Sequence, residues 1–258
     1  MCDYCQFFKS IHFDINTLKD FNKIYVLISG GFDSTLLADF VHAHYPTKTY
    51  FVNCWNPYEQ SPTLQEFQGR ANFIQVKPKG EFNYGAVLKQ SFLNIPKALA
   101  LKRKGKYHKK VFPCCYYIKH KAFFKDPMFL EPNTVVVSGI KFGDGQKRAL
   151  YMNKLRNEGK KFEKDFGKKC DKVGFLHQHH KGQMFIYPYR DYTRRELPKD
   201  IKKRLTDSHP GIKHSGCSIC PVLVVWGLRN EKSRYWKSMD YWNKLNGQRQ
   251  LNYLGRLL

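Results

Sequence analysis

The most concentrated chemistry in the chain lies in seven consecutive residues that combine glycines with hydroxyl and carboxylate side chains. In order, they are Ser29, Gly30, Gly31, Phe32, Asp33, Ser34 and Thr35. Glycine lets a backbone approach a ligand closely, and backbone N–H groups in front of a helix attract anions. The Walker A spacing and its lysine are missing, which excludes a P-loop. The stretch predicts a phosphate-binding turn, with a strand–helix turn that binds no ligand as the alternative.

Two cysteine pairs, far apart in the sequence, supply four thiol groups. They are Cys114-Cys115 and Cys217-Ser-Ile-Cys220. Four thiolates can bind zinc or a [4Fe–4S] cluster, and the residues alone leave both open. Adjacent cysteines point in divergent directions, so a Cys-Cys pair is uncommon in ordinary zinc ribbons.

A Cys-x-x-Cys also lies near the N-terminus, at Cys2 and Cys5. It supplies half of a Zn²⁺ site and needs two more ligands. The candidates elsewhere in the chain are His12, Cys170, His177, His179 and His180. The alternative for Cys2 and Cys5 is a pair of exposed thiols on a frayed end of the chain. The alternative for the region of Cys170 and the three histidines from 177 to 180 is a solvated basic loop.

Positive charge dominates the composition, with 45 Lys and Arg against 21 Asp and Glu and a net charge of +24. Such a charge attracts polyanions through counterion release. We therefore expect a nucleic acid partner, tRNA or DNA, with a generally basic proteome or a solubility device as the alternative. Residues 97–125 carry ten basic and no acidic side chains, interleaved with aromatic residues that suit base stacking. A helix with a solvated lysine face also explains that stretch.

Short apolar strands alternate with helical segments around the phosphate turn. Strands are expected at 24–28, 48–53 and 73–77, and helices at 36–41 and 64–69. This alternation predicts an α/β fold with a mainly parallel sheet. Because ligands of such sheets bind beyond the carboxyl ends of the strands, Asn53 and Cys54 are expected to lie beside a nucleotide.

The remaining organisation follows from composition. No apolar run reaches 18 residues, which predicts no membrane span, and a signal peptide is not recognisable, so we expect a cytoplasmic protein. Three segments are expected: an N-terminal Cys-x-x-Cys segment at 1–20, an α/β domain at 21–225 with a basic insertion at about 141–182, and a helical aromatic and basic tail at 226–258. In the tail, Trp236, Met239 and Trp242 recur at helical spacing, which predicts core packing.

Four motifs, in order along the chain, resemble those of one protein family. The phosphate turn has the SGGxDS form of the adenine-nucleotide α-hydrolase (PP-loop) superfamily. Cys114-Cys115 with Lys119, followed by Gly216-Cys217-x-x-Cys220-Pro221, resembles the cluster motif of adenylyl-sulfate reductases, which belong to the phosphoadenylyl-sulfate (PAPS) reductase family. Residues 135–148 resemble the family's GxR…ES..R segment. Residues 184–193 resemble its P…DWT strand and helix start, with Thr193 as the helix cap.

The resemblance implies a doubly wound sheet around the PP-loop and a [4Fe–4S] cluster at the four cysteines Cys114, Cys115, Cys217 and Cys220. It implies that ATP or an adenylyl sulfonucleotide is contacted by Ser29, Gly30, Gly31, Asp33, Ser34, Thr35 and Asn53. Mg²⁺ would be held through Asp33. Lys141, in place of the usual arginine, and Arg148 would bind the anionic end of the substrate, whereas Gly145 replaces the usual serine. Asp33, Lys141 and Arg148 are therefore the expected catalytic residues.

One departure from the family bears on the reaction. Sulfonucleotide reductases of the family attack with a C-terminal cysteine, and no cysteine follows Cys220 here. The first hypothesis is therefore an ATP-dependent iron–sulfur enzyme that transfers sulfur to a nucleic acid. The second is a sulfonucleotide reductase whose nucleophile is Cys2, Cys5, Cys54 or Cys170 or comes from a partner, and the third is a non-catalytic nucleic-acid-binding protein. A sulfur donor or reductant protein and a second copy of the chain are further candidate partners.

Overall fold

The computed structural model describes residues 4–59, 61–78, 80–105, 111–124, 126–141, 152–154, 157, 176–178, 184–212, 217–227 and 232–254. Several residues with predicted roles lie outside this part, so those roles stay predictions: Cys2, Arg148, Cys170, His179 and His180.

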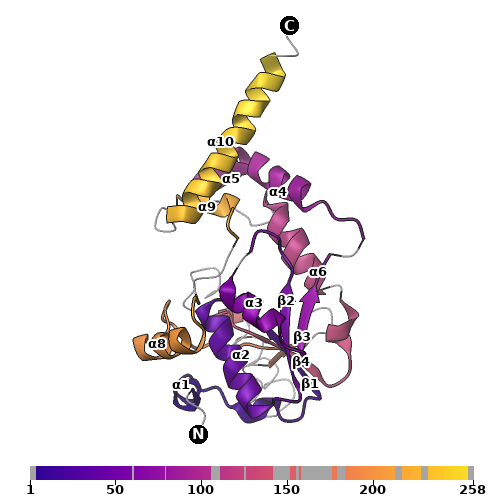
Figure 1. The fold of residues 1–258 in the computed structure, drawn as a ribbon, viewed down its shortest axis with the longest axis vertical. Coiled ribbons are helices and arrows are strands. Elements are labelled where there is room, and N and C mark those ends of the chain that lie inside the picture. Colours follow the sequence, from indigo (N-terminus) through magenta and orange to yellow (C-terminus); the bar gives the residue numbers. More distant parts are fainter. Residues whose placement is uncertain are drawn as a thin grey trace. The chain divides into compact units, whose positions relative to one another are not determined.

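The chain divides into two compact units. Unit 1 comprises Met1–Asn53, Ser61–Gln75 and Asp126–Ser215, and unit 2 comprises Cys54–Gln60, Val76–Lys125 and Gly216–Leu258. Figure 1 labels the elements of both units along the chain. The three segments expected from the sequence stay a prediction about domains.

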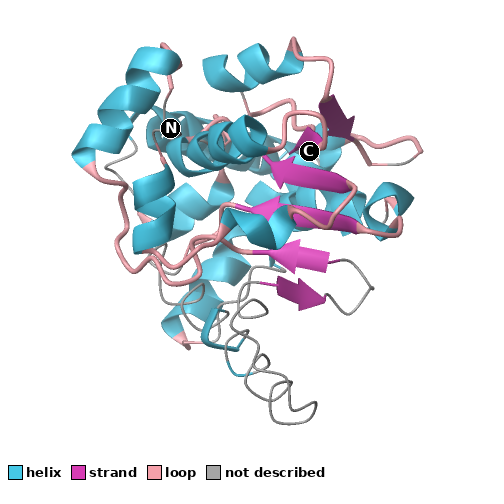
Figure 2. Ribbon diagram, turned by 90° about the horizontal axis from the view of Figure 1, so that it is seen from below, coloured by secondary structure: helices cyan, strands magenta, loops and turns pink. Residues whose placement is uncertain are grey.

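A six-stranded sheet forms the centre of unit 1, in the order β3-β2-β1-β4-β6-β5 (Figure 2). The strands are β1 (Lys23–Leu27), β2 (Thr49–Cys54), β3 (Phe73–Val76), β4 (Thr134–Ser138), β5 (Leu176–Gln178) and β6 (Met184–Ile186). β1 pairs in parallel with β2 and β4, β4 pairs in parallel with β6, and β5 is antiparallel to β6. The predicted α/β fold with a mainly parallel sheet is confirmed. The expected loop around His177 is wrong, because this residue lies on β5, a three-residue edge strand too short to leave a periodic signal.

Helical segments cover both faces of this sheet. In unit 1 they are α1 (Cys5–Ser10), η1 (Ile15–Leu18), α2 (Phe32–His44), α3 (Pro62–Gln68), η4 (Pro127–Leu130) and α8 (Lys199–Ser208). Successive residues of a strand point to opposite faces. Ile24 and Val26 of β1 join a buried core with Leu36 of α2, whereas Tyr25 contacts Phe129 of η4, with ring centroids 5.2 Å apart. This two-sided arrangement is the doubly wound architecture that the resemblance implied.

The start of α8 differs from the sequence prediction. Thr193 was expected to cap a helix running to Leu205, but α8 begins at Lys199 with Pro198 at the cap position. The reason is that a proline inside a helix removes a hydrogen bond and clashes with the preceding turn. Residues 193–197 are therefore not helical, with a bend at 195 and 196, and the helix starts after the proline.

The strand register places the carboxyl ends of three neighbouring strands, β1, β2 and β4, at the same edge of the sheet. Leu27 of β1 lies opposite Val52 of β2 and Ser138 of β4. From β1 the chain continues to β2 on one side, while β4 pairs on the other. A reversal of this kind is where open α/β sheets bind ligands, and the predicted phosphate turn follows β1 at this point.

Unit 2 is helical and has its own core. Its helices are α4 (Tyr84–Leu93), α5 (Ile95–Arg103), the π-helix η3 (Cys115–Lys121), α6 (Ala122–Phe124), α9 (Pro221–Trp226) and α10 (Lys232–Leu254). In Figure 1, α5, α9 and α10 lie side by side. The core includes Phe92, Ile95, Phe112, Ile118, Val225 and Leu245. Within the described part of the chain, no helix has both the length and the apolar character that a membrane span requires.

The long helix α10 corrects one prediction about the tail. Trp242 packs against the core of unit 2, as expected, but Trp236 is 60% exposed. The buried face of α10 instead follows Tyr235, Ser238 and Leu245. Trp236 is the residue after Tyr235 and therefore lies to the side of the buried face. Its helical spacing from Trp242 does not bring it into the core.

Candidate functional site

The predicted phosphate turn is the connection from β1 to α2, with Gly31 as the N-cap of the helix. Gly30 has a φ of +73°, a region that favours glycine, and a Cβ added there would lie 2.4 Å from Ser61 Oγ. The Ser61 hydroxyl donates to the Gly30 carbonyl at 3.1 Å. Both backbone conformation and space therefore require glycine at position 30.

Ser34 closes this turn on itself. Its Oγ accepts a hydrogen bond from the Ser29 N–H at 3.2 Å and donates to the Gly31 carbonyl at 3.0 Å. The first turn of α2 follows directly, and first-turn N–H groups lack acceptors within their own helix and favour anions. Thr35, in contrast, is fully buried, and its Oγ1 has no hydrogen-bond partner among the described residues.

Asp33 and Lys141, both predicted to be catalytic, contact each other directly. Lys141 Nζ lies 2.8 Å from each carboxylate oxygen of Asp33. The Lys141 side chain is only 4% exposed and that of Asp33 is 31% exposed. Each partner is neutralised by the other, so binding Mg²⁺ at Asp33 or an anion at Lys141 requires this ion pair to open.

The end of β2 is tied to the end of β1, and the segments after β4 and β6 support the start of α2. The buried Asn53 donates its side-chain amide to the Ile28 carbonyl at 2.9 Å, which joins the ends of β1 and β2. After β4, Gly139 lies against the backbone of Asp33. After β6, the Tyr189 hydroxyl donates to the Asp33 carbonyl at 2.9 Å. Burial, and then the charge of Asp33, raise the pKa of Tyr189 well above its usual value, so it stays a donor. Sequence reasoning missed Tyr189, although it lies within the 184–193 motif.

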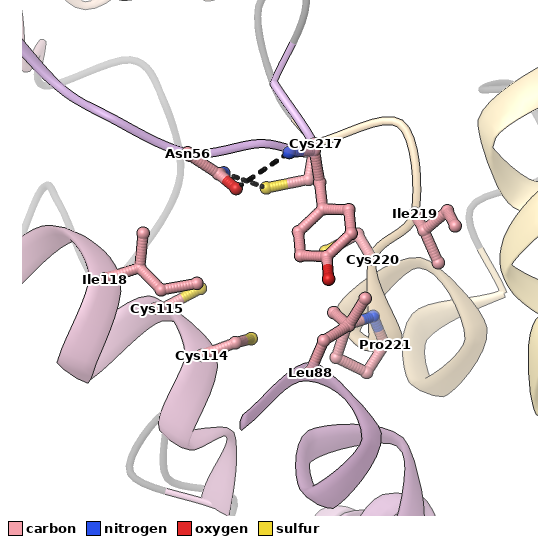
Figure 3. Close-up of a pocket in the computed structure, with 10 residues that line it drawn as sticks. Asn56, Leu88, Cys114, Cys115, Ile118, Cys217, Ile219, Cys220 and Pro221 are labelled. Atoms are coloured by element: carbon pink, nitrogen blue, oxygen red, sulfur yellow. Dashed lines mark hydrogen bonds between the residues drawn. The ribbon is translucent and has the colours of Figure 1, made fainter. Parts of the chain in front are cut away.

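The four cysteines predicted to bind metal line one cavity of unit 2 (Figure 3). Cys115 is the first residue of η3 and Cys114 directly precedes it, whereas Cys217 and Cys220 come from the segment that leads into α9. The other lining residues are Asn56, Tyr58, Leu88, Ile118, Ile219 and Pro221. Segments about a hundred residues apart in the sequence thus place their thiols around one space.

Hydrogen bonds fix the second cysteine pair in this cavity. Arg234 Nε of α10 donates to the Cys217 carbonyl, and Ser238 Oγ of the same helix accepts from the Cys220 N–H, both at 2.9 Å. The Asn56 amide donates to the Cys217 sulfur at 3.0 Å (Figure 3). Sequence reasoning missed these three partners, and the only available signal was the Asn-Pro turn that begins at Asn56.

Burial and neighbouring thiols set the protonation of the cysteines. The hydrogen bond with Cys115 lowers the pKa of Cys114, burial raises it, and a bond with Ser91 lowers it, with a net lowering. Burial, followed by the charges of Cys217 and Cys115, raises the pKa of Cys220 to about 11. Cys220 is therefore a thiol at neutral pH and needs the positive charge of a metal centre to become a thiolate.

The donor set suits a soft metal centre. Thiolates select zinc or iron–sulfur centres, whereas magnesium and calcium prefer oxygen. The lining residues include four thiols and several apolar side chains but no carboxylate or imidazole. Across the residues that the structure describes, no three His, Cys, Asp or Glu side chains form a group that could hold a metal ion. The four thiols share one cavity.

Comparison with known proteins gives a remote likeness among solved structures. No family model matches the chain, and no curated protein matches it. Among solved structures, the chain is similar to the U34-tRNA thiolase NcsA from Methanococcus maripaludis with its [4Fe-4S] cluster. The identity is 15%, the TM-score is 0.35, and the match covers 95% of this chain and 81% of that chain. The site assignments above rest on the contacts within this chain.

The N-terminal Cys-x-x-Cys has one described partner. Cys5 Sγ lies 3.6 Å from His44 Nε2 of α2, and His44 Nδ1 lies 2.8 Å from the Phe40 carbonyl. Sequence reasoning named His12 here and missed His44. Because Cys2 lies outside the described residues, the Zn²⁺ site at Cys2 and Cys5 stays a prediction.

Proposed function

We propose that the chain is an ATP-dependent enzyme that transfers sulfur to a nucleic acid and holds a [4Fe–4S] cluster at Cys114, Cys115, Cys217 and Cys220. The observation that carries this proposal is the single cavity lined by all four thiols. A cluster takes one thiolate at each of four iron atoms, so its ligands lie further apart than four ligands of one zinc ion. The residues that line the cavity supply one thiol for each of the four iron atoms. If one of the four thiolates opened, the cluster would supply a Lewis-acidic iron able to hold a sulfur atom.

The turn between β1 and α2 would hold the phosphates of ATP. The first-turn N–H groups of α2 offer donors to an anion. The hydroxyls of Ser29 and Ser34 would join them by releasing their present hydrogen bonds within the turn. In this proposal the Lys141–Asp33 pair opens when ATP binds. Lys141 then faces a phosphate oxygen, and the Asp33 carboxylate accepts Mg²⁺. Arg148 keeps its predicted role as a second anion-binding residue.

The proposed reaction has two steps. In the first, an oxygen of the nucleic acid attacks the α-phosphorus of ATP, and the bond from that phosphorus to pyrophosphate breaks. The donors of the turn stabilise the negative charge that develops on pyrophosphate. In the second, a sulfur nucleophile attacks the activated carbon, and AMP leaves with the original oxygen. The net result is replacement of one oxygen by sulfur.

The direct test uses protein purified without oxygen and reconstituted with iron and sulfide. It is incubated with ATP, Mg²⁺, a sulfur source, and tRNA or DNA. We expect release of AMP and pyrophosphate, together with a sulfur-containing nucleoside detected by mass spectrometry. Protein that binds iron but releases neither product would contradict the proposed reaction.

Cysteine variants test the metal site separately. Cys217→Ser should lower bound iron and labile sulfide strongly because it removes a ligand, whereas Cys54→Ser should leave both unchanged because Cys54 lies outside the cavity lining. Binding of zinc in place of iron by the unaltered protein would overturn the cluster assignment.

A further inference from the structure

Unit 2 carries most of the net positive charge of the chain. Its 100 residues include 20 Lys and Arg and four Asp and Glu, which gives +16 of the total net charge of +24. The other 158 residues, in unit 1, carry the remaining +8. A polyanion is therefore the partner whose charge complements unit 2.

Exposed aromatic rings occur in the same unit. The exposed large hydrophobic side chains of the described residues are Tyr116, Tyr117, Trp226 and Trp236 in unit 2 and Leu130 in unit 1. Trp226 is 43% exposed and Trp236 is 60% exposed. Tryptophan is highly buried on average, so two exposed indoles on one unit call for a partner that covers them.

Two of these rings are paired with lysines. Lys102, near the end of α5, donates to the Val225 carbonyl at 2.9 Å, and its Nζ lies 4.4 Å from the centroid of the Trp226 ring. On η3, Lys121 Nζ lies 5.0 Å from the centroid of the Tyr117 ring. Each pair places an ammonium group over one face of an exposed ring. A nucleotide can use both, because its base stacks on the ring and its phosphate pairs with the ammonium.

We propose that unit 2 binds an unpaired segment of RNA, with bases stacked on Trp226, Trp236 and Tyr117. Bases inside a duplex are stacked on each other, so their faces are closed to protein rings. Folded RNA offers unstacked bases in loops and bulges, which makes it the nucleic acid that these rings fit best. This inference rests on the proposed function and deepens it by naming unpaired RNA as the nucleic acid.

Binding of short labelled oligonucleotides to the full-length protein tests the inference. The probes are a single-stranded RNA, the RNA duplex of the same sequence, and the single-stranded DNA of that sequence. We expect the single-stranded RNA to bind tightest and to quench tryptophan fluorescence. Neither ATP nor the cluster enters this measurement, so its failure is distinct from failure of sulfur transfer.

Variants separate stacking from general electrostatic attraction. Trp226→Leu and Trp236→Leu should each weaken RNA binding about tenfold, whereas Trp226→Phe should keep most of the affinity because it retains a ring. Lys102→Gln should lower the slope of log affinity against log salt by about 0.7, the value for one phosphate contact of a single strand. Leu130→Ala and Lys203→Gln, exposed positions of unit 1, are the matched controls and should bind as the unaltered protein does.

Three results would overturn the inference. The first is equal affinity for duplex and single-stranded RNA. The second is unchanged RNA binding by both leucine variants while circular dichroism shows that they are folded. The third is tighter binding of single-stranded DNA than of RNA, which would assign the surface to another nucleic acid.

Discussion

Lys141 is the buried partner in its ion pair, and this asymmetry predicts how the pair responds to substitution. Asp33→Asn removes the carboxylate that faces an ammonium group only 4% exposed, which should lower the free energy of unfolding by about 3 kcal/mol. Lys141→Met leaves a carboxylate that is 31% exposed and can be hydrated, so the loss should be about 1 kcal/mol. The double variant should lose less than the sum of the two. Urea denaturation of the three variants measures these differences.

An exposed pair provides the control for this cycle. Lys203 and Asp207 of α8 lie 3.0 Å apart with side chains 78% and 63% exposed. Lys203→Met and Asp207→Asn should each change the free energy of unfolding by less than about 0.5 kcal/mol. If Lys141→Met were as costly as Asp33→Asn, burial of the ammonium would not be the reason for the asymmetry.

At single residues, the sequence predicts the type of chemistry better than it predicts partners. The glycine at position 30 and the four cysteines are informative because few residue types meet those demands. The contact of Lys141 with Asp33 could not be inferred, since it depends on the level register of β1 and β4. Asn56 and Tyr189 are common residue types, and only the folded chain shows that one contacts a cysteine sulfur and the other supports α2.

Three helices of unit 1 are joined by one histidine at the C-cap of α8. His209 Nε2 lies 2.8 Å from Asp39 of α2, and Nδ1 lies 2.7 Å from Glu66 of α3. The ring also stacks on Phe67, and Arg70 pairs with Glu66. The bond with Asp39 raises the pKa of His209, burial lowers it, and the bond with Glu66 raises it, so that the pKa is raised overall.

The raised pKa of His209 predicts that the folded state loses stability as the pH rises. A raised histidine pKa means that the stabilisation is complete below the unfolded value of about 6.5 and disappears as the pH rises through the folded value. The urea midpoint of the protein should therefore fall over that range, and His209→Asn should show a lower and flatter profile. His42 of α2 serves as a contrast because burial, followed by Arg70, lowers its pKa while Asp39 raises it. Substitution of His42 should instead change how the urea midpoint depends on pH at acidic pH. If the urea midpoint of His209→Asn fell with pH as steeply as that of the unaltered protein, His209 would not be the group responsible.

Elements with strong periodic patterns were predictable, and those decided by tertiary contacts were not. The apolar runs of β1, β2 and β3 and the apolar spacing of α2 were recognisable because buried strands and amphipathic helices need them. The start of α8 was missed because Pro198 outweighs the capping potential of Thr193. Trp236 was misplaced because spacing gives an angle around a helix and does not say which face another element covers.

At the scale of the whole molecule, the two units have separate cores. The core of unit 1 is built from β1, α2, β4 and α8, and that of unit 2 from α4, α5, η3 and α10. Each unit is assembled from segments that alternate along the chain, such as 54–60 and 76–125 in unit 2. The composition of contiguous stretches of the chain therefore could not show that most of the net positive charge belongs to one unit.

This separation predicts where removal of the metal centre acts. Cys114, Cys115, Cys217 and Cys220 all belong to unit 2, and a bound centre joins segments separated by about a hundred residues, which restricts the unfolded chain. Hydrogen exchange of iron-loaded and chelator-treated protein should therefore show lost protection in α4, α5, η3, α9 and α10. Protection of β1, α2 and β4 should stay the same, because their core contains none of these thiols. Cys54→Ser protein, which should keep its metal, is the control for the thiol substitution itself. An equal loss of protection in β1 and β4 would mean that the metal centre stabilises both cores together.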